Sequence, residues 1–148
     1  MDFDVVSNSP DETIELGRQM GTQFQGGEVV AFCGLLGSGK THLIKGVACG
    51  LGAAVSKAVT SPTFVIVKEY TGRFDIYHID AYRIESVEEF EKVGFYDYCH
   101  EGSVVVIEWA DKIESALGGL DYVRVELFHA GQNQRKIYFK NMPEYVVL

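Results

Sequence analysis

Residues 34–41 read Gly-Leu-Leu-Gly-Ser-Gly-Lys-Thr, a run that fits the pattern G-x-x-x-x-G-K-[ST] of a phosphate-binding loop. The glycines of such a loop let backbone N–H groups turn inward around phosphate oxygens. Lys40 then reaches the β- and γ-phosphates, and the Thr41 hydroxyl ligates Mg²⁺. The residues predicted here to contact a nucleotide are Leu36, Gly37, Ser38, Gly39, Lys40, Thr41 and His42.

The segments on either side of this run support the interpretation. Residues 28–33, Glu-Val-Val-Ala-Phe-Cys, have the apolar pattern of a buried strand that enters the loop. Residues 41–51 have the pattern of a helix that leaves it, with Gly50 and Gly52 as signals for its end. A strand, a glycine loop and a helix in that order are the context in which the motif binds phosphate.

The rest of the chain predicts a single α/β domain spanning residues 1–148. Residues 103–107 form the most apolar run, which is typical of a strand in the centre of a parallel sheet. Turn signals and alternation predict the other elements: helices over residues 9–25, 86–92 and 111–117, and strands over residues 64–70, 73–79, 122–128 and 135–139. The expected fold is a three-layer P-loop NTPase domain whose mixed sheet is parallel at its centre and has antiparallel hairpins at its edges.

Composition narrows the classes of function. The formal net charge is −8, and a surface of this sign repels a nucleic-acid backbone, so we do not expect a protein that binds DNA or RNA by itself. No apolar run approaches the ~20 residues of a membrane span, and the acidic start at residues 1–4 is unlike a signal peptide. Three widely spaced cysteines indicate reduced thiols, and hence a cytoplasmic protein.

Two acidic residues follow predicted strands, at Asp80 and at Glu108. In folds of this type the groups that complete the nucleotide site lie at the carboxyl ends of neighbouring strands. An apolar strand that ends in an acid is the pattern of a Walker B carboxylate, which holds Mg²⁺ or orients the attacking water. The residues alone leave open which of the two acids has which role.

Four linked segments together resemble the TsaE family, also called YjeE, which comprises small bacterial P-loop ATPases needed to make threonylcarbamoyladenosine in tRNA. The segments are the loop at residues 34–41, Ser-Pro-Thr-Phe at 61–64, His-Ile-Asp-Ala-Tyr-Arg at 78–83 and Glu-Trp at 108–109. Their order and spacing agree with the family pattern, and the match covers nearly the whole chain.

The resemblance implies a set of roles for these residues. Lys40 and Thr41 would bind the phosphates of ATP and Mg²⁺, Asp80 would be the acid linked to Mg²⁺, and Glu108 would be the second essential acid. Thr63 would lie in a switch-like loop, and Trp109 would lie near the nucleotide. The implied catalytic residues are Lys40, Asp80 and Glu108, and the implied metal site is Thr41, Asp80 and Glu108.

The resemblance also implies partners. Family members act with TsaD, which transfers the threonylcarbamoyl group, and with its companion TsaB, so tRNA would be contacted only through these partners. Two positions depart from the family pattern, because Leu35 stands where an acid is common and His42 where a second threonine is common. Neither position supplies the phosphate cradle, so we expect binding to survive, while turnover and the fit to partners are open.

The sequence also bears on three other classes of protein with a phosphate-binding loop: a metabolite kinase, a GTPase and a nucleotide-gated scaffold. A small metabolite kinase usually has an arginine-rich lid, whereas this chain has five widely spread arginines. A GTPase is disfavoured because there is no N-K-x-D or D-x-x-G motif. A nucleotide-gated scaffold without useful turnover remains open, because the groups that complete such a site can come from a partner.

Overall fold

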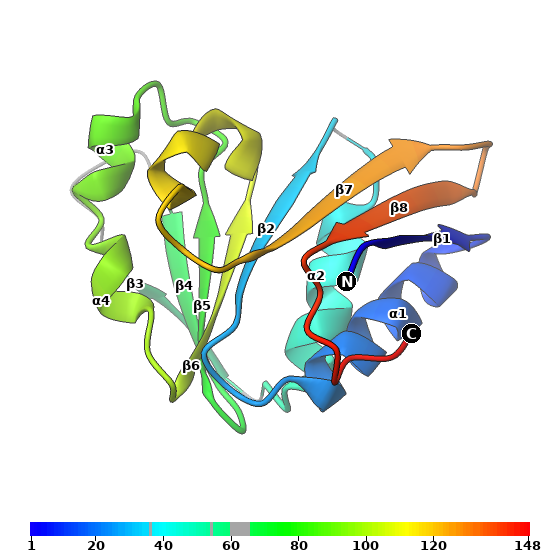
Figure 1. Ribbon diagram of the computed structural model, residues 1–148, viewed down its shortest axis with the longest axis horizontal. Coiled ribbons are helices and arrows are strands. Elements are labelled where there is room, and N and C mark those ends of the chain that lie inside the picture. Colours follow the sequence, from blue (N-terminus) through cyan, green and yellow to red (C-terminus); the bar gives the residue numbers. More distant parts are fainter. Residues whose placement is uncertain (36, 54, 60–65) are drawn as a thin grey trace.

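The computed structural model describes residues 1–35, 37–53, 55–59 and 66–148. Two residues predicted to contact the nucleotide, Leu36 and Thr63, lie outside the described residues, as does the whole Ser-Pro-Thr-Phe segment at 61–64. Figure 1 shows the described elements around one twisted sheet.

The sheet has eight strands in the order β1-β8-β7-β2-β6-β5-β4-β3. The strands are β1 (Phe3–Ser7), β2 (Val29–Gly34), β3 (Val55–Val59), β4 (Ile66–Thr71), β5 (Asp75–Asp80), β6 (Ser103–Glu108), β7 (Val123–His129) and β8 (Arg135–Lys140). The four central strands β7, β2, β6 and β5 are parallel to one another, and both edges are antiparallel. The predicted mixed sheet is confirmed, and β1 and β3 are additional edge strands that the sequence analysis did not predict.

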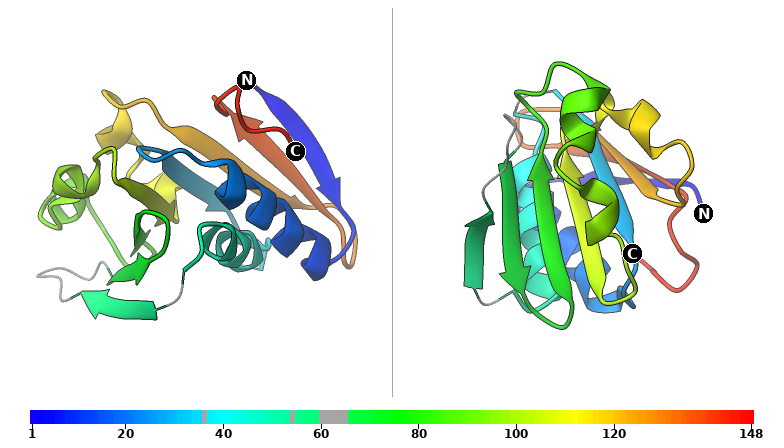
Figure 2. Two further views of the ribbon diagram at one scale, coloured as in Figure 1. Left: turned by 90° about the horizontal axis from the view of Figure 1, so that it is seen from below. Right: turned by 90° about the vertical axis from the view of Figure 1, so that its left-hand side faces the viewer.

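Helices cover both faces of the sheet, as expected for three layers (Figures 1 and 2). On one face, α1 (Pro10–Gln23) and α2 (Lys40–Gly50) pack on an apolar core that includes Phe32 of β2 and Val106 of β6. On the other face, the short helices α3 (Val87–Glu91) and α4 (Phe95–Tyr98) pack on a second core with the alternate residues of the same strands. Successive side chains of each buried strand point to opposite faces of the sheet, so each strand contributes residues to both cores.

The predicted helix over residues 111–117 is wrong. In its place the chain forms two 3₁₀ turns, η1 (Ala110–Lys112) and η2 (Glu114–Leu117). Ile113, between them, has φ −130° and ψ 14°, which is outside the helical region and interrupts a continuous helix. The other predicted helices exist, and α1 begins after Ser9, whose side chain caps the N–H of Glu12 at 3.1 Å as the sequence indicates.

Glycines let α1 and α2 approach each other backbone to backbone. Gly17 and Gly21 of α1 face Gly46 and Gly50 of α2, and a Cβ atom built on Gly46 would lie 2.0 Å from the carbonyl oxygen of Ile14. A Cβ on any of the other three would lie between 2.2 and 2.3 Å from a carbonyl oxygen of the facing helix. No larger side chain fits at these positions, so the glycines fix where α2, and the loop that precedes it, sits on α1.

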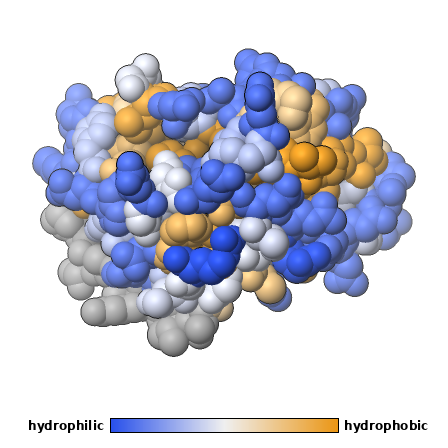
Figure 3. All heavy atoms as spheres, turned by 60° about the horizontal axis from the view of Figure 1, so that its bottom comes forward, coloured by the Kyte–Doolittle hydropathy of each residue, from blue (hydrophilic) through white to orange (hydrophobic). Residues whose placement is uncertain are grey.

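The surface drawn in Figure 3 is mainly hydrophilic. Hydrophilic residues cover most of the face drawn in Figure 3, with smaller apolar patches between them. In the described part of the chain, no helix combines the length and the apolarity that crossing a membrane requires.

Candidate functional site

The phosphate-binding motif forms the turn between the central strand β2 and helix α2. Gly37 has φ 78° and Gly39 has φ 101°, a left-handed backbone region that side chains other than glycine rarely adopt. These two residues bring the chain from the carboxyl end of β2 into the first turn of α2, which begins at Lys40. The predicted strand, loop and helix are thus present, and the loop lies at the edge of the parallel strands where ligands bind in such sheets.

Lys40 is held inside this loop. Its Nζ atom donates hydrogen bonds to the backbone carbonyls of Gly34 and Leu35, the latter at 3.1 Å. The same atom lies 3.7 Å from the centre of the Trp109 ring. Burial lowers the pKa of Lys40, and the charge of Glu108 opposes that shift. The Lys40 ammonium is therefore held in a fixed position inside the loop by contacts with the loop backbone and with Trp109.

Glu108, at the carboxyl end of β6, connects the loop helix to the neighbouring strand. Its Oε1 lies 3.5 Å from the Thr41 hydroxyl, and its Oε2 lies 3.1 Å from Nε2 of His78 on β5. The hydrogen bond with His78 lowers the pKa of Glu108 against the effect of burial, and the charge of Lys40 lowers it further. Glu108 is thus kept as a carboxylate beside the first turn of α2.

Asp80 lies directly beside Glu108 in the sheet, because the two are register partners on the parallel strands β5 and β6. Register partners on adjacent strands project to the same face, so Asp80 shares the face of the sheet that α2 covers. Its Oδ1 accepts a hydrogen bond from the N–H of Tyr82 at 3.0 Å. The structure therefore brings together the two acids that the sequence predicts at the strand ends.

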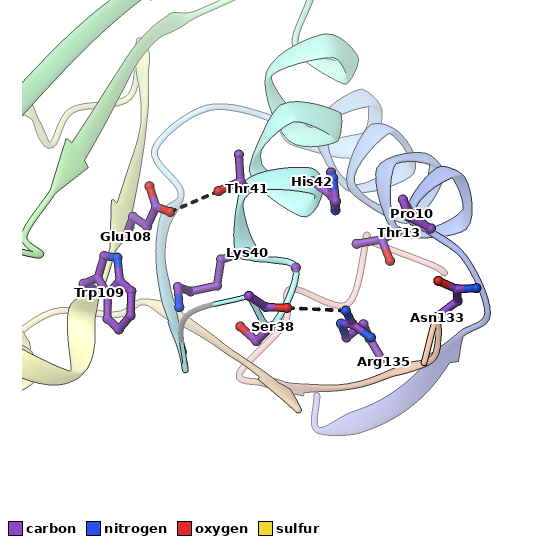
Figure 4. A pocket seen from close by; sticks show the side chains of 12 residues that line it. Pro10, Thr13, Ser38, Lys40, Thr41, His42, Glu108, Trp109, Asn133 and Arg135 are labelled. Atoms are coloured by element: carbon purple, nitrogen blue, oxygen red, sulfur yellow. Dashed lines mark hydrogen bonds between the residues drawn. The ribbon is translucent and has the colours of Figure 1, made fainter. Parts of the chain in front are cut away.

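A cavity of about 230 Å³ opens at the loop (Figure 4). It is lined by eight of the residues that the sequence predicts for the site: Gly37, Ser38, Gly39, Lys40, Thr41, His42, Glu108 and Trp109. Two buried polar atoms at this place, Ser38 Oγ and Arg135 Nε, have no hydrogen-bond partner among the described residues. Unpaired buried donors beside a cation fit a ligand that brings phosphate oxygens.

The far wall of the cavity consists of residues that no sequence motif marks. Pro10 and Thr13 come from the start of α1, while Asn133 and Arg135 come from the β7–β8 hairpin. Arg135 donates to the carbonyl of Gly37 at 3.4 Å and to that of Gln134 at 2.8 Å. Pairing of β7 with β2 brings this hairpin to the loop, and no local pattern around residues 131–135 reveals such a long-range neighbour.

The oxygen atoms of Thr41, Asp80 and Glu108 are of the kind that Mg²⁺ prefers. Among residues 1–35, 37–53, 55–59 and 66–148, no group of three or more His, Cys, Asp or Glu side chains forms a metal cage. Mg²⁺ in nucleotide sites is commonly held by one or two carboxylates together with phosphates and water. The donors present therefore fit a metal that is bound with a phosphate ligand, and do not fit a dedicated structural metal site.

Known proteins with similar sequences and folds share one family. The family model for "Threonylcarbamoyl adenosine biosynthesis protein TsaE" matches residues 7–137. A tRNA threonylcarbamoyladenosine biosynthesis protein TsaE from Treponema pallidum is 39% identical over 112 residues, which cover 76% of this chain and 82% of the relative. The Bacillus subtilis protein of the same name is 38% identical over 132 residues, covering 88% and 80%.

The fold agrees with the sequence comparison. The crystal structure of YdiB from Bacillus subtilis superposes with a TM-score of 0.71 at 28% identity, over 94% of this chain and 84% of YdiB. The family match extends over both the loop of residues 34–41 and the Glu-Trp pair at 108–109, which the fold brings to one cavity. On sequence and on structure, this chain belongs to the TsaE family.

Proposed function

We propose that the chain is an ATP-binding and ATP-hydrolysing subunit needed for the threonylcarbamoyladenosine modification of tRNA, and that it acts with TsaD and TsaB. One observation carries the ATPase part: Lys40, Thr41 and Glu108 meet at a single cavity, with Asp80 in register beside Glu108. The modification pathway comes from the relatives, whose names place them in threonylcarbamoyladenosine biosynthesis.

The proposed roles follow from the contacts. The backbone of residues 37–42 and the Lys40 ammonium would bind the phosphates of ATP, and Ser38 Oγ is an unpaired group available to them. Thr41, Asp80 and Glu108 would hold Mg²⁺, which would neutralise charge on the phosphates. Glu108 is kept ionised by His78 and would orient or deprotonate the attacking water.

The shape of the cavity supports an assignment for the rest of the nucleotide. From Lys40 the cavity extends toward Pro10 and Thr13 on one side and Asn133 and Arg135 on the other (Figure 4). With its phosphates in the loop, ATP would place its nucleoside between α1 and the β7–β8 hairpin. Arg135 would then contribute a second positive charge on the side opposite Trp109.

The partnership and the location also belong to this proposal. A chain with net charge −8 is poorly suited to hold tRNA itself, so we assign that contact to the partners. The thiols of Cys33, Cys49 and Cys99 are all free, as is usual for proteins of a reducing compartment, and this supports a place in the cytoplasm.

The test is ATP hydrolysis by the purified chain, alone and with TsaD and TsaB. Lys40→Ala removes the loop cation, and Lys45→Ala is the matched control because Lys45 is exposed on the same helix. We expect turnover that the partners stimulate and that only Lys40→Ala abolishes. Tight ATP binding without turnover in any mixture would favour the nucleotide-gated scaffold, and unchanged turnover in Lys40→Ala would contradict the assignment of the loop.

A further inference from the structure

A chain of aromatic and cationic contacts runs from the loop lysine to the protein surface. The ammonium of Lys40 lies 3.7 Å from the centre of the Trp109 ring, and the Trp109 and Tyr82 ring centres are 4.9 Å apart at an interplanar angle of 48°. The ammonium of Lys112 lies 5.0 Å from the centre of the Tyr82 ring. Both cation distances are within the range of attractive cation–π contacts, and the ring pair has a favourable tilted geometry.

Trp109 occupies a particular place around the ammonium of Lys40. An ammonium group has three N–H donors, and two neighbours of this one are the carbonyls of Gly34 and Leu35. The Trp109 ring is the third close neighbour. The ring therefore helps to hold the ammonium beside the two carbonyls, and its position bears on where Lys40 meets a phosphate.

Trp109 has a backbone conformation that is unfavourable for a bulky residue. Trp109 has φ 62° and ψ 38°, in the left-handed region, where a bulky side chain is uncommon and costs energy. Contacts elsewhere must hold it there. Besides the cation–π contact with Lys40, Trp109 makes an aromatic contact with Tyr82, a residue that is 47% exposed.

Tyr82 is itself fixed at three points. Its N–H donates to Oδ1 of Asp80, its carbonyl accepts a hydrogen bond from the Lys112 ammonium, and its ring carries the cation–π contact with that same ammonium. Tyr82 thus bridges the acid at the end of β5 and the aromatic neighbour of the loop lysine. Tyr82 does not line the cavity, and in the described part of the chain its polar contacts are with Asp80 and Lys112, so its influence on the site passes through Trp109 and Asp80.

We propose that Tyr82 and Lys112 are positioning residues that hold the Trp109 ring against Lys40 and thereby set the affinity of the loop for the phosphates of ATP. This inference rests on the proposed function, since it concerns ATP. Tyr82 is half exposed, so a change in its position at the surface would move the Trp109 ring beside Lys40 directly. The two apolar cores would not be involved.

The test compares Tyr82→Leu with Tyr82→Phe and with Tyr138→Leu. Tyr82→Phe keeps the ring and serves as the conservative rescue. Tyr138 is the matched control, because this exposed tyrosine also contacts an aromatic ring, Phe128 at 5.6 Å, and a lysine, Lys136 at 5.2 Å, but lies outside the cavity. Trp109 is the only tryptophan, so its fluorescence reports the stack without any nucleotide.

We expect Tyr82→Leu to make Trp109 more accessible to acrylamide quenching and to weaken binding of Mg²⁺-ATP, measured by calorimetry, by about two- to tenfold, the value of one aromatic pair. Tyr82→Phe and Tyr138→Leu should match the unaltered protein in quenching, and Lys112→Met should shift both readouts in the direction of Tyr82→Leu. Circular dichroism checks that each variant is folded.

Two outcomes would overturn the inference alone. In the first, Tyr82→Leu changes neither quenching nor affinity. In the second, quenching changes while ATP affinity stays the same, which would make the stack structural only. If the unaltered protein bound no ATP, the proposed function would fail and this inference would fail with it. ATP binding by the unaltered protein therefore distinguishes the two kinds of failure.

Discussion

His78 Nε2 lies 3.1 Å from Glu108 Oε2, although 30 positions separate the two residues in the chain. The parallel pairing of β5 with β6 creates this contact, since it sets His78 opposite Val106 and Asp80 opposite Glu108. The hydrogen bond stabilises the ionised form of Glu108, which is the form needed beside Thr41. The same contact has consequences for stability and for turnover that can be measured separately.

The first prediction concerns stability and pH. The pKa of Glu108 is lowered from its usual 4.5 in the folded protein, so its contribution to stability is fully present above the unfolded-state pKa and is lost as pH falls through the folded-state value. Glu108→Gln removes this titration. The difference in unfolding free energy between the two proteins should therefore shrink as pH falls below about 4.5, as followed by urea unfolding at several pH values. Glu91→Gln, at an exposed position, is the control, and a difference that did not change below about pH 4.5 would contradict the assignment.

The second prediction concerns turnover. Glu108→Gln keeps the size of the side chain but removes the carboxylate that we propose orients or deprotonates water, so we expect it to bind Mg²⁺-ATP and to hydrolyse it about a hundredfold or more slowly. Calorimetry and single-turnover hydrolysis measure the two properties. Glu91→Gln, at an exposed position of α3, should change neither. Loss of Mg²⁺-ATP binding in Glu108→Gln would show that Glu108 acts mainly by holding the metal and not on the attacking water.

The third prediction tests the far wall of the cavity. Arg135 reaches the loop carbonyl of Gly37, whereas the next residue, Lys136, projects to the other face of β8, where its ammonium lies 3.6 Å from Asp4. Arg135→Gln and Lys136→Gln each remove one positive charge from the same hairpin. Only Arg135→Gln should weaken Mg²⁺-ATP binding, by roughly ten- to a hundredfold if a charge-assisted hydrogen bond is lost. Equal effects of the two substitutions in a calorimetric titration would show that net charge alone is responsible.

The fourth prediction tests the contact between α1 and α2. In Gly46→Ala the new Cβ would lie 2.0 Å from the carbonyl oxygen of Ile14, so the helices must separate. We expect a loss of stability of about 1–3 kcal/mol or more, typical of overpacking, seen as a lower melting temperature. Gly119→Ala adds the same methyl group where nothing lies within 4 Å and should leave the melting temperature nearly unchanged. Similar melting temperatures for the two variants would contradict the close packing.

The sequence predicted the parts of the fold that depend on local pattern. The strand before the loop, the helix after it and the apolar strand β6 carry strong periodicity, and the acids Asp80 and Glu108 could be placed because they follow such strands. The edge strands β1 and β3 could not be predicted in this way. Each is only five residues long, and β1 is stabilised by a partner distant in sequence, through pairs such as Phe3 with Phe139. β3 pairs with the next strand, β4, but its five residues carry too little pattern to mark a strand.

Part of the site was beyond sequence reasoning for the same physical cause. Arg135, Asn133 and Thr13 reach the cavity through sheet order and helix packing, and no local motif marks them. The His78–Glu108 contact also depends on strand register, and a histidine in a strand predicts no particular partner. The roles assigned to Lys40, Asp80 and Glu108 stay predictions until turnover is measured.

The two sides of the phosphate-binding loop differ in rigidity, because one of them rests on the backbone contact between α1 and α2. Both helices present glycines at this contact, so there is no flexible side chain to compress. The position of α2 against α1 is therefore rigid. The other side of the loop is bordered by single side chains, Trp109 and Tyr82, which contact each other through their rings. Under the proposed function, we therefore expect adjustment during turnover at Trp109 and Tyr82 and not between α1 and α2.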